Sequence, residues 1–256
     1  MIKAAFFDVD GTLMDHSVGQ IPEDTKEALK RLRQKGIRIF TGTGRHISEL
    51  RKLGITELDF DGHVLLNGQI CLDKAGRVLD AHAIDEEDRK TAIRWFEKKE
   101  LPISFVEQDR IYINFINDRV RKTQADISSD LPEMGSVTGD PVYLINVFAD
   151  DGDVNRLLKD MPHCSSTRWN PYGVDVIAAG NSKAKGIRQM ISHYNICREE
   201  IIAFGDGEND MEMLEYAGIG VAMGNADPEV KEIADYVTDG VGEGGISHAL
   251  THFGLI

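Results

Sequence analysis

The sequence predicts an α/β protein: a Rossmann-like parallel-sheet core with an inserted α+β domain. Short apolar runs alternate with helix-period patterns at both ends of the chain, and several of these runs end in polar turns that open a helix. In the middle of the chain this alternation gives way to closely spaced β-type runs. We therefore place a discontinuous core at residues 1–82 and 182–256, with a separate domain at 83–181.

The first elements form a strand, a helix and a second strand. Residues 3–7 are a short apolar run, and the apolar positions between 21 and 32 follow helical spacing. Pro22 suits the first helical turn, and Gly36 suits the helix end. Residues 37–40 then predict a second strand, which a right-handed βαβ connection makes parallel to the first.

The remaining elements follow from the same patterns. The core continues with a helix at 46–53, a strand at 64–66 that breaks at Asn67 and Gly68, and a hairpin around 74–76. For the inserted domain we predict helices at 85–100 and 151–159, and strands at 103–106, 111–115, 142–148 and 174–178. From Ser182 onward the regular alternation of helix and strand returns.

Composition excludes several classes of function. The 256 residues contain 29 basic and 43 acidic side chains, a net charge of −14, which disfavours nucleic acids and anionic membranes as partners. No apolar run approaches the ~18 residues that span a bilayer. The three cysteines are far apart and form no Cys-x-x-Cys pair, which is typical of reduced thiols. We expect a cytoplasmic protein.

The chemistry begins at Asp8-Val9-Asp10-Gly11-Thr12, where a strand ends. Ligands bind at this edge of a parallel sheet. One carboxylate, Asp8, can attack phosphorus, and the second, Asp10, can protonate a leaving oxygen and then activate water. A simpler interpretation, in which both side chains only cap a turn, stays open at this point.

Two further segments suit phosphate binding. Thr43 and Gly44 stand between a predicted strand and a helix, where a hydroxyl, an unhindered amide and the helix N-terminus all favour an anion. Lys183 and Lys185 open a later helix, and either could neutralise phosphoryl charge. A single lysine is more often a solvated surface charge, so this segment indicates phosphate binding only in combination with the other segments.

A second acidic strand end follows at Gly205-Asp206-Gly207-Glu208-Asn209-Asp210. Two acidic strand ends side by side can share a hard cation, and Mg2+ prefers oxygen ligands completed by water and a substrate phosphate. Asp206 would be the direct ligand. Neither acidic segment is an EF-hand loop, because Leu13 and Met211 stand where the glycine is required.

These four segments, in this order, resemble the four motifs of the haloacid dehalogenase superfamily of phosphatases. The insertion between the second and third motifs, together with Asn67-Gly68 and Gly205-Asp206-Gly207-Glu208-Asn209-Asp210, further resembles the Cof-type hydrolases, which carry an α/β cap there. The resemblance implies that Asp8 is the nucleophile and Asp10 the general acid and base. It also implies a Mg2+ site formed by Asp8, the backbone carbonyl of Asp10, Asp206 and Asp210.

The same resemblance implies phosphate binding by Thr43, Gly44, Lys183 and Asn209. Many relatives read Gly-x-Ser-Lys-Gly, whereas Ala184 holds the last glycine position here, so the choice between Lys183 and Lys185 stays open. The cap is expected to close as a lid and read the leaving group. Our candidates for substrate contacts are Arg45, Asn67, Arg168, Trp169, Asn170 and Tyr172, although Trp169 and Tyr172 could equally pack the cap.

The expected function is therefore Mg2+-dependent hydrolysis of a small phosphorylated metabolite by a monomer or weak homo-oligomer. Sugar phosphates are the substrate class that the resemblance favours. A sugar phosphomutase, a pyridoxal or flavin phosphate phosphatase, and a phosphometabolite-binding sensor are the alternatives. The run 240–245 formally matches a dinucleotide-binding fingerprint, but only 11 residues follow it, too few for a βαβ unit.

Overall fold

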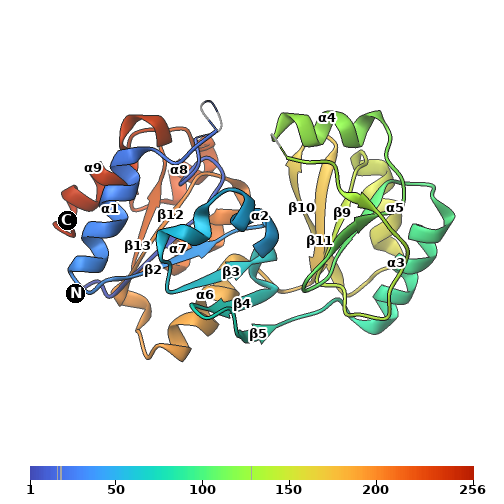
Figure 1. The fold of residues 1–256 in the computed structure, drawn as a ribbon, viewed down its shortest axis with the longest axis horizontal. Coiled ribbons are helices and arrows are strands. Elements are labelled where there is room, and N and C mark those ends of the chain that lie inside the picture. Colours follow the sequence, from blue (N-terminus) through green and yellow to red (C-terminus); the bar gives the residue numbers. More distant parts are fainter. Residues whose placement is uncertain (16, 18, 128) are drawn as a thin grey trace. The chain divides into compact units, whose positions relative to one another are not determined.

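The computed structural model describes residues 1–15, 17, 19–127 and 129–256, and it divides into two compact units. The core unit comprises Met1–Ala81 and Ser182–Ile256, and the inserted unit comprises His82–Asn181 (Figure 1). Within the described ranges, no helix has the length and hydropathy that crossing a bilayer requires.

The core unit is built on one eight-stranded sheet. Its order is β14-β13-β12-β1-β2-β3-β4-β5, and the first six strands in this order are parallel. The predicted parallel-sheet α/β core is thus confirmed. The parallel strands are β1 (Ala4–Phe7), β2 (Arg38–Gly42), β3 (Gly62–Leu65), β12 (Ile201–Gly205), β13 (Ile219–Ala222) and β14 (Tyr236–Val237). The antiparallel pair at one edge is β4 (Ile70–Asp73) and β5 (Val78–Ala81).

Strand register brings three loops to one edge of this sheet. Phe7, the last residue of β1, pairs with Phe204 of β12 on one side and with Thr41 of β2 on the other. The residues that follow each strand therefore leave the sheet side by side, at its carboxyl edge. The central strands are fully buried, as expected for a parallel sheet that is covered on both faces.

Helices cover both faces of the core sheet. On one face α1 (Glu23–Gln34) packs against α9 (Gly245–His252), and both can be followed in Figure 1. On the other face α6 (Lys183–His193), α7 (Met211–Tyr216) and α8 (Pro228–Ile233) share an apolar cluster with Phe6 and Phe40. The short α2 (Ile47–Lys52) follows β2. Pro22 precedes α1 as its N-cap rather than lying in its first turn, because its ψ of 145° is extended.

The inserted unit has its own sheet, in the order β10-β11-β9-β6-β7-β8. An apolar cluster joins alternate residues of the central strands to Trp95 and Phe96 of α3 and to Leu157 of α5. The helices are α3 (Glu86–Lys98), α4 (Asp118–Asp126) and α5 (Asp151–Lys159). The strands are β6 (Ile103–Val106), β7 (Ile111–Ile113), β8 (Glu133–Met134), β9 (Leu144–Val147), β10 (Cys164–Asn170) and β11 (Gly173–Ala178).

Three elements of the inserted unit were not predicted: β8, which has only two residues, β10 and α4. Strand β10 reads Cys-Ser-Ser-Thr-Arg-Trp-Asn and lies at the edge of the sheet, so it carries no apolar alternation. Helix α4 buries only Val120 and Thr123, and one turn of buried residues is too short a pattern to show a helical period. All three elements are recognisable only once the neighbouring strands are in place.

Burial makes His63 a source of pH-dependent stability. His63 is 8% exposed, and its ring lies 2.9 Å from the Thr41 hydroxyl. Burial, and then the charge of Arg51, lower the pKa of His63 to about 4, against an ordinary value of 6.5. The unfolded chain therefore takes up this proton near pH 6.5, whereas the folded chain does so only near pH 4, so acidification through this interval favours unfolding.

We predict that protonation of His63 lowers the free energy of unfolding by about 2 kcal/mol when the pH falls from 7.5 to 5. His63→Asn lacks this contribution. In denaturant titrations at the two pH values, its free energy of unfolding should therefore fall by about 2 kcal/mol less than that of the unsubstituted chain. The matched control is His193→Asn on the exposed side of α6, which should keep the full pH dependence. Equal pH dependence in His63→Asn and in the unsubstituted chain would contradict the prediction.

Candidate active site

The first acidic loop leaves β1 and turns at Gly11. The backbone N–H of Asp8 still donates to the Phe204 carbonyl at 3.0 Å, so Asp8 remains anchored to the sheet. Gly11 adopts a φ of +77°, and a Cβ at this position would lie 2.1 Å from Oδ2 of Asp206. Only glycine fits here, because a side chain would strain the backbone and displace the carboxylate.

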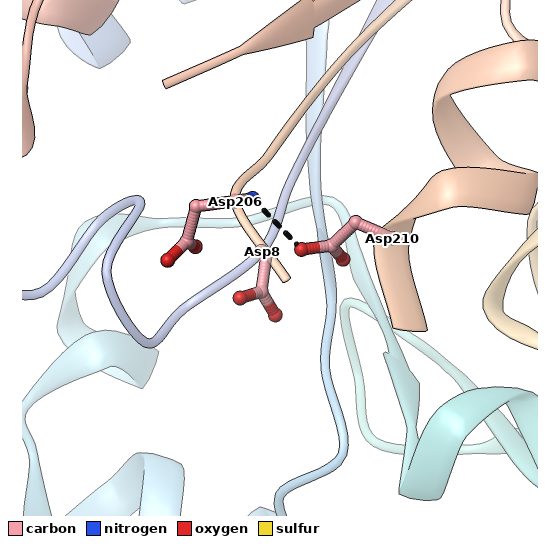
Figure 2. Close-up of side chains that lie close together, drawn as sticks. All are labelled: Asp8, Asp206 and Asp210. Carbon is pink, nitrogen blue, oxygen red and sulfur yellow. Dashed lines mark hydrogen bonds between the residues drawn. The ribbon is translucent and has the colours of Figure 1, made fainter. Parts of the chain in front are cut away.

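The second acidic loop leaves β12 and forms a short 3-10 turn. Oδ2 of Asp210 accepts hydrogen bonds from the backbone N–H groups of Asp206 (2.9 Å) and Gly207 (3.0 Å), which fixes the turn. Thr12 from the first loop donates its hydroxyl to Oδ1 of Asp206 at 2.9 Å. Figure 2 shows the carboxyl groups of Asp8, Asp206 and Asp210 facing a common space. One oxygen from each lies within 4.8 Å of the others.

Lys183, the first residue of α6, stands against this acidic cluster. Its Nζ donates to Oδ1 of Asp8 at 2.7 Å and to Oδ1 of Asp210 at 2.6 Å, and the residue is 1% exposed. Ser182 caps the helix by accepting from the N–H of Lys185. Of the two candidate lysines, the structure thus brings Lys183 to the acidic residues.

The electrostatics of the cluster favour a divalent cation. When all three carboxyl groups are ionised, they exceed the single ammonium group by two negative charges within a few ångströms. Burial, and then the charge of Asp210, raise the pKa of Asp8 well above its usual range and that of Asp206 to about 7. Burial alone would lower the pKa of Lys183, but the carboxylates of Asp210 and Asp8 outweigh it, and the pKa is raised. An all-oxygen donor set with this charge fits Mg2+.

Asp10 lies outside the group of three carboxylates and forms an ion pair with Arg45. The Nε and one terminal nitrogen of Arg45 donate to the two oxygens of Asp10, both at 2.7 Å, in a bidentate pair. Arg45 also lies 3.4 Å from Glu49, whose other oxygen accepts from the N–H of His46 at the start of α2. The sequence identified both Asp10 and Arg45 as site residues but did not predict that they pair.

The loop after β2 places the other predicted phosphate ligands. The Thr43 hydroxyl accepts from the N–H of Arg45 at 3.1 Å, and the Thr43 carbonyl accepts from the N–H of Asn67 at 3.0 Å. The Asn67 side chain in turn accepts from the Asn209 side chain at 3.1 Å, and it packs against Gly44. Thr43, Gly44, Asn67 and Asn209 thus come from three separated segments and meet in one contact network.

Comparison with known proteins now identifies the chain. Residues 5–250 match the sequence profile of the haloacid dehalogenase-like hydrolases. The chain belongs to this family. A Bacillus subtilis protein provisionally named phosphatase YkrA is 32% identical over 99% of this chain and 98% of its own length.

Solved structures give the same family. Phosphatase BT1666 from Bacteroides thetaiotaomicron superposes with a TM-score of 0.90 at 32% identity, covering 100% of this chain and 96% of that one. The sugar phosphatase BT4131 of haloacid dehalogenase subclass IIB superposes with a TM-score of 0.88 at 39% identity, covering 99% and 100%. The protein is thus a haloacid dehalogenase-like phosphatase, and its family is generally metal-dependent.

Four of the candidate substrate-contact residues of this phosphatase belong to the inserted unit. They lie around the β10–β11 turn. Arg168 donates to Asp151 and to two backbone carbonyls of the turn. Asn170 donates to Asp126 and accepts the N–H of Tyr172, whose ring lies beneath Arg119. These contacts give Arg168, Asn170 and Tyr172 a structural role within the unit. Their contact with substrate stays a prediction.

Trp169 connects this turn to a polar group that the sequence analysis missed. Its indole N–H donates to Oδ1 of Asp175 at 2.8 Å, and the amide of Asn146 donates to the same oxygen at 2.8 Å. Asp175 and Asn146 pair across β11 and β9, and Asn146 pairs onward with Ser104 of β6. One row of the sheet is therefore polar across three strands. Single polar residues within three apolar strands were its only sequence signal.

We predict that Lys183 stabilises the metal-free phosphatase. Lys183→Met leaves the buried carboxylates of Asp8 and Asp210 without their cation. Removing one partner of a buried ion pair lowers the free energy of unfolding by about 3 kcal/mol or more. Denaturant unfolding in EDTA at neutral pH should show this loss. Lys185→Met, two residues along the same helix, is the control and should change the free energy by less than about 1 kcal/mol. Equal effects of the two substitutions would contradict the assignment.

Proposed function

We propose that this phosphatase hydrolyses phosphate monoesters of small metabolites, most of all sugar phosphates, through an aspartyl-phosphate intermediate and with Mg2+. The observation that supports this most strongly is the cluster of Asp8, Asp206 and Asp210 around Lys183. It combines a nucleophile at a strand end with two uncompensated negative charges. Asp8, the carbonyl of Asp10, Asp206 and Asp210 would hold the ion, which supplies charge neutralisation for the transferring phosphoryl group.

In the first step Asp8 displaces the leaving group. Lys183 occupies Oδ1 of Asp8, so we assign the attack on phosphorus to Oδ2. A new oxygen–phosphorus bond forms while the ester oxygen–phosphorus bond breaks, and Asp10 gives its proton to the departing alkoxide. Arg45 contacts both oxygens of Asp10, so at least one of these contacts must open before Asp10 can carry and donate that proton.

In the second step water releases phosphate. Asp10, now ionised, accepts a proton from a water molecule whose oxygen attacks the phosphorus of the aspartyl phosphate. The bond between phosphorus and Asp8 breaks, and Asp8 is restored as a carboxylate. Lys183, Thr43, the N–H of Gly44 and Asn209 would hold the phosphoryl oxygens during both steps. Donors that are already in place before reaction cost no reorganisation in the transition state.

We assign recognition of the leaving group to the inserted unit. The Asp175 carboxylate with its two donors, Asn146 and Trp169, forms a built hydrogen-bonding group that suits a hydroxylated leaving group. Similarity to a sugar phosphatase at 39% identity supports the same substrate class. Arg45 and Asn67 of the core unit, with Arg168, Asn170 and Tyr172, complete the set of candidates.

A cytoplasmic location is part of the proposal. The three cysteines are free thiols, and burial together with the charge of Asp80 raises the pKa of the Cys71 thiol to about 12. Such a thiol is unreactive and packs as an apolar side chain. These features support a protein that works in a reducing compartment.

We predict that phosphate release depends on Asp8, Asp10 and Mg2+. A panel of sugar, pyridoxal, flavin and nucleotide monophosphates should show release that EDTA abolishes and Mg2+ restores. Asp8→Asn should lose the activity, and Asp10→Asn should lower the turnover of sugar phosphates by about 100-fold or more, because general acid–base catalysis contributes that much.

Three outcomes would contradict the proposed function. Release that persists undiminished in Asp8→Asn would contradict the aspartyl-phosphate route. Tight binding of a phosphate ester without turnover by the unsubstituted protein would favour a sensor, and transfer of the phosphoryl group to a second hydroxyl would favour a mutase. Asp118→Asn, at the first turn of α4 in the inserted unit, is a charge-matched control that should remain active.

A further substitution tests the leaving-group assignment. Asn146→Ala removes one donor to Asp175, and we expect kcat/KM for sugar phosphates to fall about tenfold, the equivalent of one hydrogen bond. Release from p-nitrophenyl phosphate, which has no hydroxyls to read, should change little. A parallel loss with both substrates would assign Asn146 to the folding of the inserted unit instead.

A further inference from the structure

Asn225 links three segments of the core unit through one side-chain amide. It lies in the turn between β13 and α8, and its Nδ2 donates to the Gly11 carbonyl at 2.8 Å and to Oδ2 of Asp206 at 3.3 Å. Its Oδ1 accepts from the backbone N–H of Val241 at 2.9 Å. Asn225 is exposed, so packing does not explain its place.

The contact with Val241 fixes which way the amide faces. A backbone N–H can only donate, so Oδ1 of Asn225 must lie on the Val241 side. The two N–H bonds of Nδ2 then point to the Gly11 carbonyl and the Asp206 carboxylate, both of which can only accept. The glycine-rich run 240–245, excluded above as a dinucleotide site, thereby acquires a role through the 3-10 turn that begins at Val241.

The backbone around Asn225 is tied to the same strand that carries Asp206. The N–H of Met223 donates to Gly205 at 3.0 Å, and the N–H of Asp227 donates to the Asp206 carbonyl at 3.3 Å. The N–H of Gly224 donates to the Asp239 carbonyl at 2.9 Å, one residue before the glycine-rich run. The turn is therefore a fixed base from which the Asn225 side chain reaches the two loops.

The neutral amide of Asn225 is a suitable hydrogen-bond donor to a carboxylate that binds a metal ion, here Asp206. Gly11 and Asp206 approach so closely that a Cβ on Gly11 would overlap Oδ2 of Asp206, so their spacing has little tolerance. With Thr12 on Oδ1 and Asn225 on Oδ2, each oxygen of Asp206 has a neutral donor. Neutral donors orient a carboxylate while leaving its full negative charge available to a cation.

We propose that Asn225 is a positioning residue that holds Asp206 and the Gly11 turn in the geometry that binds the divalent cation, with the glycine-rich turn setting its orientation. The proposal rests on the metal dependence proposed above. Loss of such an outer partner commonly lowers metal affinity about 10- to 100-fold. Asn225→Ala should weaken cation binding by this factor.

The test is Mn2+ binding to the full chain without substrate, measured by calorimetry and by the electron paramagnetic resonance of free Mn2+. Asn155→Ala on the exposed side of α5 is the matched control and should bind Mn2+ like the unsubstituted chain. Val241→Pro removes the backbone donor to Oδ1 of Asn225, at a first helical position that tolerates proline. Like Asn225→Ala, it should weaken Mn2+ binding, but by a smaller factor.

Thermal unfolding in EDTA separates positioning from folding. A purely structural role would lower the melting temperature of Asn225→Ala and leave the Mn2+ dissociation constant unchanged, and this outcome would overturn the proposal. If the unsubstituted chain binds neither Mn2+ nor Mg2+, the proposed metal dependence fails and this inference fails with it. If that chain binds Mn2+ and Asn225→Ala binds it equally well, only this inference fails.

Discussion

The Lys183 ammonium group, held between Asp8 and Asp210, is the interaction on which the acidic site depends. Two carboxylates from different strand ends would repel one another in a buried space, and a single cation that contacts both at under 3 Å allows them to approach. Lys183 reaches them because Ser182 caps α6 and sets the first residue of the helix at the sheet edge. The position of one helix start thus decides whether Asp8 and the other candidate metal ligands can share a site.

The parallel sheet supplies the rest of that geometry. β1, β2 and β12 are adjacent and in register, so the loops that follow Phe7, Gly42 and Gly205 emerge together although they lie up to ~200 residues apart in the chain. Apart from Arg38 at the start of β2, the residues of these strands are buried, so no strand can tilt independently of its neighbours. The loops therefore inherit the rigidity of the sheet, and short side chains such as aspartate and threonine are long enough to meet.

This is also why much of the site could be predicted from the sequence. An apolar run that ends in acids is visible locally, and parallel pairing brings such ends together without further information. Choosing Lys183 over Lys185 required the helix phase, because residues two apart on a helix point about 200° from each other. The pair of Arg45 with Asp10 and the contacts of Asn225 depend on side chains that meet across separate loops, and no local pattern marks them. Strand β10 and helix α4 were missed because they bury too little apolar surface.

The acidic residues of the site also differ in the kind of hydrogen-bond partner that each one has. Asp10 is neutralised by a cation in a bidentate pair, whereas the described residues that donate to Asp206, Thr12 and Asn225, are both neutral. Lys183 compensates one of the three negative charges in the cluster. The remaining negative charge, which would attract a divalent cation, lies on Asp8, Asp206 and Asp210 and not on Asp10. The separation is one of partners, since the negative charge of Asp10 still contributes to the raised pKa of Asp8 and of Asp206. Because all four carboxylates lie within two short loops, this separation depends on which partner each loop meets rather than on distance.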